Sequence, residues 1–319
     1  MLTQVQTYIQ KHQLLECTAP VLVACSGGAD SIALLHMLIQ LGYTCHVAHC
    51  NFHLRGDESN RDEQFVCQWC QSYHCPCYVQ HFDTKDYAQQ HKISIELAAR
   101  ELRYQWFETL RQRISAQAIA VAHHQDDNIE TSLLHLIRGT GILGLTGMQP
   151  KNGYVVRPLL ALTRQQIEQY LQNQHIDYVT DSTNLETDYT RNKVRLQLIP
   201  MLESINPSFS QVMATNIQNF NATQRIYARY VAQQKKTWYR KKDGQILINL
   251  SGLQEQLEAE TLLFEWLKEF KIHPAEIGKI LHAQTGSRFS NKYCLMHVKR
   301  LPDKGYKCLI VEDIRKEAD

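Results

Sequence analysis

The chain has 319 residues, of which 44% are hydrophobic and 21% charged, a composition typical of a folded globular protein whose core needs no disulfides. The formal net charge of +2 does not by itself indicate a polyanion-binding protein. No run of about 18 apolar residues predicts a membrane span, and the N-terminus lacks the apolar segment of a signal peptide. We therefore expect a cytoplasmic protein with one large and one smaller domain.

Short β-branched segments alternate with helical segments in the first half of the chain. The predicted strands are 21–25, 45–50, 77–82, 118–123 and 154–159, and the predicted helices are 31–41, 57–73, 94–112 and 126–136. This alternation predicts right-handed βαβ units, and hence an α/β fold with a parallel sheet that carries helices on both faces. Such a sheet binds ligands beyond the carboxyl ends of its strands.

The first predicted strand, 21–25, runs directly into the loop SGGADS and then into a helix. Its glycines have no Cβ to block the approach of a phosphate, and consecutive N–H groups at a helix N-terminus attract an anion. The loop lacks the lysine that usually accompanies γ-phosphate transfer, which favours a reaction that releases pyrophosphate and transfers AMP. An aspartate beside a triphosphate indicates bound Mg²⁺. The candidate ATP-binding residues are Ser26, Gly27, Gly28, Ala29, Asp30 (also the candidate Mg²⁺ ligand) and Ser31.

Four cysteines lie close together after the second strand. Cys67 and Cys70 fall on the predicted helix 57–73, and Cys75 and Cys77 open the next strand. Their spacing permits a zinc or iron–sulfur site, but no second CxxC follows at the expected distance. We favour packing as small apolar residues, and in a reducing cytosol disulfides are not expected.

The predicted helix 94–112 places Glu96, Arg100 and Arg103 at positions i, i+4 and i+7, on a single stripe. Two interpretations fit this stripe. It is either an exposed face with salt bridges or a set of phosphate contacts beside the sheet.

Acidic residues follow the fourth strand in the run HHQDDNIET. Asp127 and Glu130 lie three residues apart at the start of a helix, so their carboxylates share one face. Paired carboxylates beyond a strand end suit a metal ion or an ammonium group. Capping of the helix N-terminus is the structural alternative, which we favour only for Asp126.

The segment 181–200 carries a second polar cluster. Arg191 and Arg195 lie one helical turn apart and suit forked contacts to a phosphate or a carboxylate, although exposed helix arginines are the simpler alternative. The other polar residues of this cluster are Asp181, Ser182, Asn184 and Asn192.

The composition changes after Pro207, where we place the boundary between domains 1–207 and 208–319. Residues 1–207 carry 16 Lys and Arg against 20 Asp and Glu, and residues 208–319 carry 18 against 12. The second domain is therefore basic, which favours polyanion binding. Its predicted elements are a helix over 208–240, a turn at 243–244, a strand over 246–250, a helix over 253–270 and a closing β-hairpin made of 292–300 and 306–313, which together give a smaller, mostly helical domain.

The end of the first of these helices interleaves cations with two aromatic residues. Lys235, Lys236 and Arg240 surround Trp238 and Tyr239. We favour RNA phosphate contacts with base stacking, and keep a solvated helix end with core aromatics as the alternative.

The SGGADS loop resembles the pyrophosphate loop of the N-type ATP pyrophosphatases. From about residue 18 to Pro207 the chain further resembles the tRNA(Ile)-lysidine synthase family. This resemblance implies that O2 of the wobble cytidine in the CAU-anticodon tRNA(Ile) attacks the α-phosphate of ATP and pyrophosphate leaves. The amine of L-lysine then displaces AMP, and the lysidine that results switches decoding from Met to Ile codons.

The resemblance also implies roles for individual residues. Asp127 and Glu130 receive the substrate lysine, and Arg195, in preference to Arg191, binds its α-carboxylate. Arg100 and Arg103 contact phosphates of ATP or of tRNA. The basic residues of the second domain contact phosphates of tRNA. One motif departs from the family: HVNHGLRG is replaced by the HCNFHLRG of 49–56, so no role carries over to His53.

Two other functions compete with this interpretation. A tRNA thiolation enzyme with the same loop needs one CxxC before the region of Arg100 and another near residue 181, and neither position has a cysteine. A non-catalytic tRNA-binding relict would not need Asp30, Asp127 and Glu130, all of which are present.

Overall fold

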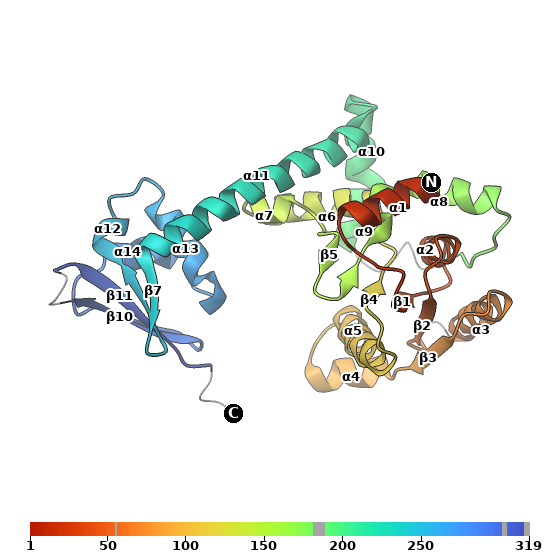
Figure 1. The fold of residues 1–319 in the computed structure, drawn as a ribbon, viewed down its shortest axis with the longest axis horizontal. Coiled ribbons are helices and arrows are strands. Elements are labelled where there is room, and N and C mark those ends of the chain that lie inside the picture. The colour runs from red at the N-terminus through yellow and green to blue at the C-terminus, as the bar shows by residue number, and fades with distance from the viewer. Residues whose placement is uncertain (55, 181–188, 302–304, 316–319) are drawn as a thin grey trace. The chain divides into compact units, whose positions relative to one another are not determined.

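The computed structural model describes residues 1–54, 56–180, 189–301 and 305–315. The chain forms two compact units, Met1–Asn221 and Ala222–Asp319, whose division falls within the long helix α11 (Phe209–Trp238) (Figure 1). The functional boundary near Pro207 stays a prediction. No helix among the described residues is both long and apolar enough to cross a bilayer.

Unit 1 is built on a six-stranded sheet with the order β3-β2-β1-β4-β6-β5. Every neighbouring pair is parallel except β5 and β6, which are antiparallel. The strands are β1 (Val21–Ala24), β2 (Cys45–Asn51), β3 (Cys77–His81), β4 (Ala118–Ala120), β5 (Lys151–Asn152) and β6 (Val155–Val156). The predicted parallel sheet is therefore confirmed.

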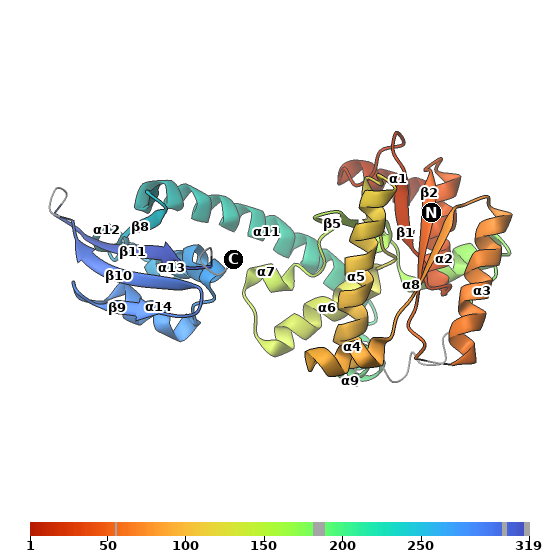
Figure 2. The ribbon, with the colours of Figure 1, turned by 90° about the horizontal axis from the view of Figure 1, so that it is seen from below.

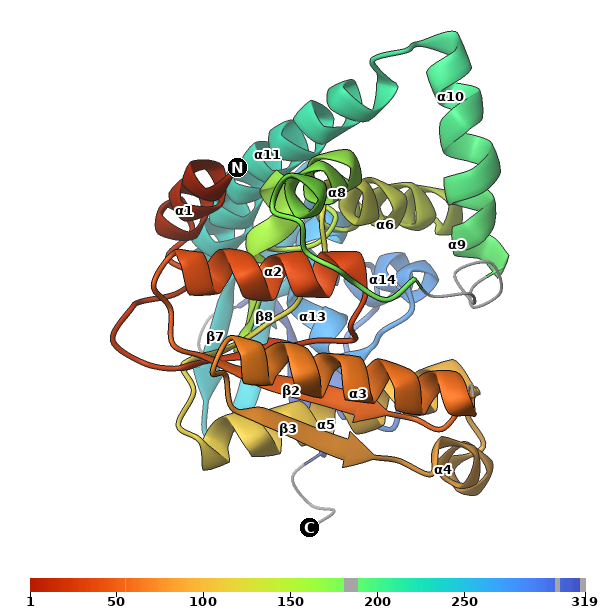
Figure 3. The same ribbon diagram turned by 90° about the vertical axis from the view of Figure 1, so that its right-hand side faces the viewer.

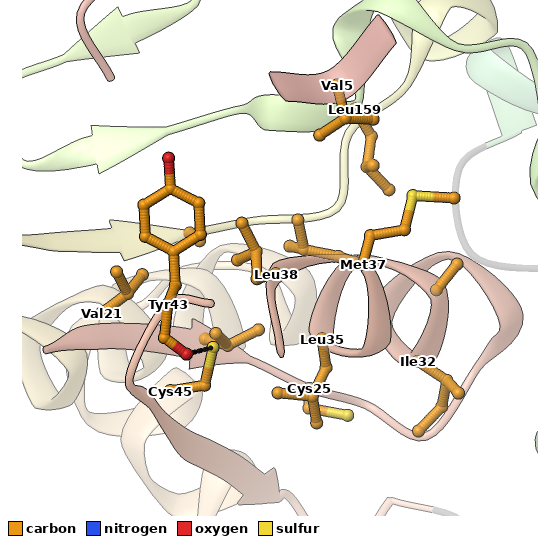
Figure 4. Close-up of a cluster of buried hydrophobic side chains, with 14 of the residues drawn as sticks. Val5, Val21, Cys25, Ile32, Leu35, Met37, Leu38, Tyr43, Cys45 and Leu159 are labelled. Carbon is orange, nitrogen blue, oxygen red and sulfur yellow. Dashed lines mark hydrogen bonds between the residues drawn. The ribbon is translucent and has the colours of Figure 1, made fainter. Parts of the chain in front are cut away.

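Helices cover both faces of this sheet because the strands bury side chains on both sides. In β1, Val21 and Val23 join the cluster formed by α1, α2, α3 and α8, whereas Leu22 joins the cluster of α5 on the opposite face (Figure 3). Helix α2 has nine buried residues, and its apolar side chains lie between the strands and α1 (Figure 4). The helices of unit 1 before α11 are α1 (Leu2–Lys11), α2 (Ala29–Gln40), α3 (Asp57–Ser72), α4 (Thr84–His91), α5 (Ile95–Arg113), α6 (Gln125–Arg138), α7 (Ile142–Leu145), η1 (Pro158–Ala161), α8 (Arg164–Asn173), α9 (Tyr189–Lys193), η2 (Val194–Leu198) and α10 (Ile199–Ile205).

Two predicted strands of unit 1 are shorter than expected. The strand predicted over 118–123 ends at Ala120, and the strand predicted over 154–159 is reduced to β6. Pro158 has no N–H to donate to a sheet and instead begins the 3₁₀ helix η1. The polar residues that follow Ala120 therefore lie beyond the carboxyl end of β4 and are not part of the strand.

Unit 2 contains an antiparallel five-stranded sheet with the order β7-β8-β11-β10-β9; Figure 2 shows β8, β11, β10 and β9 side by side. The strands are β7 (Tyr239–Lys242), β8 (Gln245–Asn249), β9 (Arg288–Ser290), β10 (Cys294–Arg300) and β11 (Lys307–Asp313), and the helices are α12 (Leu250–Leu253), α13 (Ala259–Leu267), η3 (Lys268–Phe270) and α14 (Pro274–Leu281). The helices bury one face of the sheet, where Ile246, Val298 and Val311 join the apolar core. The predicted closing hairpin is the β10–β11 pair.

The elements at the start of unit 2 differ from those predicted. The helix expected to reach Arg240 ends at Trp238, and Tyr239–Lys242 forms β7 with its turn at Asp243 and Gly244. The helix predicted over 253–270 is divided into α12, α13 and η3. Pairing with β8 explains the first change, because the segment gains a hydrogen-bonded ladder there and buries Tyr239.

The clustered cysteines pack against the core of unit 1. Cys70 is buried, and Cys75 and Cys77 lie against the same apolar cluster. Within the residues described, no group of three His, Cys, Asp or Glu side chains is placed to hold a metal ion. In their contacts with this core, Cys70, Cys75 and Cys77 agree with the favoured packing interpretation.

Candidate active site

A cavity of about 830 Å³ opens at the carboxyl ends of β1 and β4. From β1 the chain crosses to β2, and from β4 it crosses to β6 on the other side, so the loops that leave these two strands diverge. Crevices at such a reversal of strand order bind ligands in doubly wound sheets. One part of the wall is apolar, with Ala48 and Phe107, and another is ionic, with Asp30, Asp127 and Arg164. Its volume suits a nucleotide.

The loop Ser26–Ser31 is held in shape by its own hydroxyl groups. Ser31 Oγ donates to the Gly28 carbonyl at 2.9 Å and accepts from the Ser26 amide at 3.2 Å. The buried His49 donates from Nδ1 to the Cys25 carbonyl at 2.9 Å, which is a structural role. The Ser31 hydroxyl therefore fixes the turn, and the assignment of Ser31 to ATP binding stays a prediction.

Gly27 is the position where the loop requires glycine. Its φ is +93°, and a Cβ there would approach Val66 Cγ2 to 3.2 Å and Val179 Cγ2 to 3.5 Å. The Val179 amide also donates to the Gly27 carbonyl at 2.9 Å. The segment after α8 is thus tied to the loop. The predicted cluster residues Asp181, Ser182 and Asn184, which follow it, lie outside the described residues.

Asp30 lies in the first turn of α2 and points into the cavity. Its Oδ2 pairs with the guanidinium of Arg164 and lies 3.8 Å from His124 Nε2. Burial raises the pKa of Asp30, more than the charges of His124 and Arg164 lower it. Its Oδ1 is buried and accepts no hydrogen bond from any residue in the described parts of the chain. A buried carboxylate oxygen with an unused lone pair fits a divalent cation.

Glu130 and Asp127 are joined to both predicted arginines. Glu130 Oε1 accepts from Arg195 Nε at 2.6 Å and its Oε2 accepts from Arg195 Nη2 at 3.1 Å, a forked ion pair. Arg191 Nε lies 3.2 Å from Glu130 Oε2, and Asp127 Oδ1 accepts from Arg195 Nη2 at 3.4 Å. Only 2% of the Glu130 side chain is exposed, against 17% for Asp127. The structure therefore brings together the four residues that were assigned to lysine.

The π-helical segment η2 places Arg195 in this cluster. It lies between α9 and α10, and such wide turns commonly occur at functional sites. Burial raises the pKa of Glu130. The hydrogen bond from Arg195 and the charge of Arg195 lower this pKa by less, so the net shift is upward. The carboxylate is therefore costly to ionise without its arginine partners.

His124 lies at the centre of the acidic run. The buried imidazole lies 3.3 Å from Asp126 and 3.4 Å from Asp127. Burial lowers the pKa of His124, but the bond to Asp126 and the charges of the surrounding carboxylates outweigh it, and the net shift is upward. Asp126 Oδ2 accepts from the Arg164 amide at 2.8 Å, so it caps α8 rather than its own helix. Asp127 supplies the cap of α6, because its Oδ2 accepts from the His124 amide at 3.1 Å.

The remaining predicted contact residues are distributed between the two units. Arg103 lines the cavity, with its guanidinium 5.2 Å from the centroid of the Phe52 ring, whereas Arg100 lies over Tyr104. Lys235, Lys236 and Arg240 belong to unit 2. Tyr239 is buried in the core of that unit and Trp238 packs against it, so the aromatic residues of this segment are core residues and the prediction of base stacking there is wrong.

Two arginines of the site were missed in the sequence. Arg164 begins α8 next to its N-cap Thr163, and Arg157 donates from Nε to His123 Nδ1 at 3.1 Å. Burial lowers the pKa of His123 to about 4, so this imidazole is neutral near pH 7. A usable signal existed for Arg164, since a cation in the first helical turn opposes the helix dipole and needs an acidic partner.

Comparison with known protein families assigns both ends of the chain. A family model described as the PP-loop domain matches residues 1–202, and one described as the TilS substrate binding domain matches residues 241–297. The first covers more than half of the chain and includes every described residue of the cavity except Glu203 and Ser210.

Similar proteins give the same result. Proteins named tRNA(Ile)-lysidine synthase are 49% identical over 288 residues in Bacteroides thetaiotaomicron and 43% identical over 279 residues in Porphyromonas gingivalis. These alignments cover 89% and 87% of this chain but 67% and 61% of the relatives. A solved structure, the U34-tRNA thiolase NcsA from Methanococcus maripaludis with its [4Fe-4S] cluster, is similar with a TM-score of 0.55 and 16% identity over 68% of this chain and 78% of its own, which shows a shared fold. From its sequence similarity and its PP-loop unit, the chain belongs to the tRNA(Ile)-lysidine synthase family.

Proposed function

We propose that the chain ligates L-lysine to C2 of the wobble cytidine in a tRNA(Ile) with a CAU anticodon, through an adenylated cytidine and with release of AMP and pyrophosphate. The observation that carries this proposal is the single cavity wall that joins the loop Ser26–Ser31 to the cluster of Asp127, Glu130 and Arg195. An activated cytidine at this place would contact the nucleotide loop on one side and an amine-binding pocket on the other. Holding two reactants in the right geometry can account for much of the reduction in an activation barrier.

ATP is assigned to the loop and to the wall that continues from it. The amides of the loop and the N-terminus of α2 attract phosphates, and the apolar wall near Ala48 and Phe107 suits the adenine. Asp30 is the residue placed to hold Mg²⁺, which when bound would neutralise charge on the departing pyrophosphate. Arg164 pairs with the Asp30 carboxylate and balances its charge.

Lysine is assigned to Asp127 in the first place. Glu130 is almost fully buried and its carboxylate already holds the fork of Arg195, so it positions this arginine for the lysine α-carboxylate. Asp127 is more exposed, and its hydrogen bond from Arg195 is longer than those of Glu130. The ε-ammonium of lysine can therefore replace Arg195 as the partner of this carboxylate. There the carboxylate orients the amine and accepts its proton, because only the free amine is a nucleophile.

The tRNA is assigned to the basic unit 2 as well as to the cavity. Opposite the helix-covered face, the strand register aligns Arg240, Leu247, Ile310, His297 and Arg288 in one row across the sheet. Arg240 and Arg288 are exposed at the two edges of this row, and Lys236 and Lys242 are exposed nearby in the chain. Cations on a sheet face with an apolar centre suit phosphate contacts with RNA.

The direct test is nucleoside mass analysis of the tRNA after incubation with protein, ATP and lysine. We expect a cytidine that has gained the mass of lysine less water, with AMP and pyrophosphate formed in equal amounts. Formation of ADP and orthophosphate, or a thiolated nucleoside, would contradict the proposal. Omitting lysine should leave pyrophosphate release but remove the modified nucleoside.

Neutralising the cations of unit 2 should weaken tRNA binding in a salt-dependent way. In a variant with Lys236→Gln, Arg240→Gln and Lys242→Gln, each lost phosphate contact should reduce the slope of log Kd against log salt by about 0.7–0.9. Filter binding at several salt concentrations measures this slope. Lys279→Gln is the matched control, because this exposed lysine lies on α14, which packs on the other face of the sheet. An unchanged slope in the triple variant would remove the sheet face from the tRNA interface.

A further inference from the structure

A second cavity, of about 270 Å³, lies beyond the carboxyl ends of β2 and β3. Four rings line it, and we call them the ring shelf: Phe52, His53, His81 and Phe82. The Phe52 and Phe82 rings stack with their centroids 5.4 Å apart, and the His53 and His81 rings stack at 4.9 Å. Phe52 and His53 come from the motif in which the chain departs from its family, whereas His81 ends β3 and Phe82 follows it. The reaction proposed above uses none of the four.

His53 has a backbone conformation that is uncommon for a residue other than glycine. Its φ is +50°, and eight non-glycine residues in the described chain have a positive φ. Six of them directly follow helices and Asp243 lies in a hairpin turn, which are the usual places for this conformation. His53 instead follows a strand. A side chain that persists at a strained position points to a role for that side chain.

Polar contacts hold the two imidazoles in place. His53 Nε2 and His81 Nδ1 share a hydrogen bond of 2.9 Å, and His81 Nε2 lies 3.6 Å from Glu63 Oε2. The buried Asn51 accepts from the His53 amide at 3.0 Å and donates to Glu63 at 2.8 Å. The rings are thus prearranged, yet 53% of the His81 side chain remains exposed. Rigid, partly exposed rings are what a stacking ligand requires.

The ring shelf adjoins the candidate active site. Phe52 lines both cavities, and the guanidinium of Arg103 lies over the Phe52 ring. Lys85 lines the smaller cavity, together with Asp83. Drug-sized ligands occupy cavities of about 300–1,000 Å³, and the smaller volume here suits a single planar group. Unpaired bases of RNA stack on Phe and His rings, with their phosphates held by Lys and Arg.

We propose that the ring shelf binds an unpaired base of the RNA substrate, next in sequence to the base that enters the main cavity. This inference rests on the proposed function for the identity of the RNA. It explains why a histidine occupies a position where glycine would be less strained, and it assigns a site to residues that lie outside the ATP and lysine pockets.

The test measures binding of an anticodon stem–loop that carries 2-aminopurine beside the target cytidine. Wild-type protein should quench this fluorophore by stacking. His53→Gly should raise the Kd about fivefold, the lower end of the effect of losing one stacked base, and His81→Ala should act in the same direction. His175→Gly is the matched control, because His175 is exposed and has the same positive φ after α8. It should leave the Kd unchanged.

A purely structural role predicts a different pattern. Glycine adopts a positive φ without strain, so the Tm of His53→Gly should not fall below that of the wild type while RNA binding weakens. Unchanged RNA affinity and unchanged quenching in both shelf variants would overturn the proposal. A raised KM for ATP with unaltered RNA affinity would place the adenine on the shelf and would also overturn it. The shelf variants could weaken stem–loop binding although the wild-type protein forms no lysidine. That result would contradict the proposed function but support the ring shelf.

Discussion

Asp127→Asn is expected to abolish lysine transfer while leaving adenylation of the tRNA in place. The substitution keeps the shape of the side chain and an oxygen that can accept from the His124 amide, so the cap of α6 survives. It removes the charge that would hold the lysine ammonium and the base that would take its proton. Loss of a single charged or polar group that stabilises a transition state commonly costs 10²–10³ in rate, and the combined loss here should reach about 10³.

The measurement separates the two half-reactions. Pyrophosphate release from ATP with tRNA should stay within a few fold of the wild type, and lysidine should be undetectable by nucleoside mass analysis. Asp126→Asn is the control, because Asp126 caps α8 through an oxygen that asparagine retains. Lysine transfer at the normal rate in Asp127→Asn would place the amine pocket elsewhere.

Asp30→Asn is expected to change stability and activity in opposite directions. Burial raises the pKa of Asp30, so the folded protein binds a proton there more readily than the unfolded chain does. Above the raised pKa the carboxylate is ionised in both states, and its burial then lowers the free energy of unfolding. Below the unfolded pKa this penalty is absent. Near pH 7 the neutral amide should therefore give a nucleotide-free protein with a Tm equal to or higher than that of the wild type.

The same substitution should eliminate pyrophosphate release, since asparagine is a poor ligand for the cation that accompanies ATP. Differential scanning calorimetry without nucleotide gives the stability effect, and a Mg²⁺ titration of the thermal shift caused by ATP gives the binding effect. The wild type should be stabilised by ATP with Mg²⁺, and Asp30→Asn much less. A large drop in Tm would identify the Asp30–Arg164 pair as a structural anchor instead.

Most of unit 1 was predictable because short apolar segments alternate with helical segments, and because polar residues follow β1 and β4 in the chain. The segment 21–25 is apolar throughout, which is typical of a central strand in a parallel sheet. The SGGADS loop predicted one side of the cavity, and the spacing of Asp127 and Glu130 predicted another. The contacts of Arg191 and Arg195 with these carboxylates were not predicted, because roughly 60 residues separate the arginines from Glu130 in the chain.

The errors arose where long-range pairing overrides local preference. Tyr239–Lys242 continues a helical pattern, and only the ladder with β8 makes it a strand. Trp238 packs so closely against Gly252 that a Cβ there would lie 2.2 Å from its ring, a contact across an intervening hairpin. Arg164 was missed for the same reason, because its partner Asp30 lies 134 residues away.

The hydroxyl network of Ser26 and Ser31 has a consequence for how fast a nucleotide can bind. Hydrogen bonds within the loop itself close the turn, so its conformational entropy is lost during folding and not at the moment of capture. An incoming polyphosphate therefore meets a receptor in its final shape. Its association rate should depend on diffusion and on ionic strength, with no slow rearrangement of the loop to limit it.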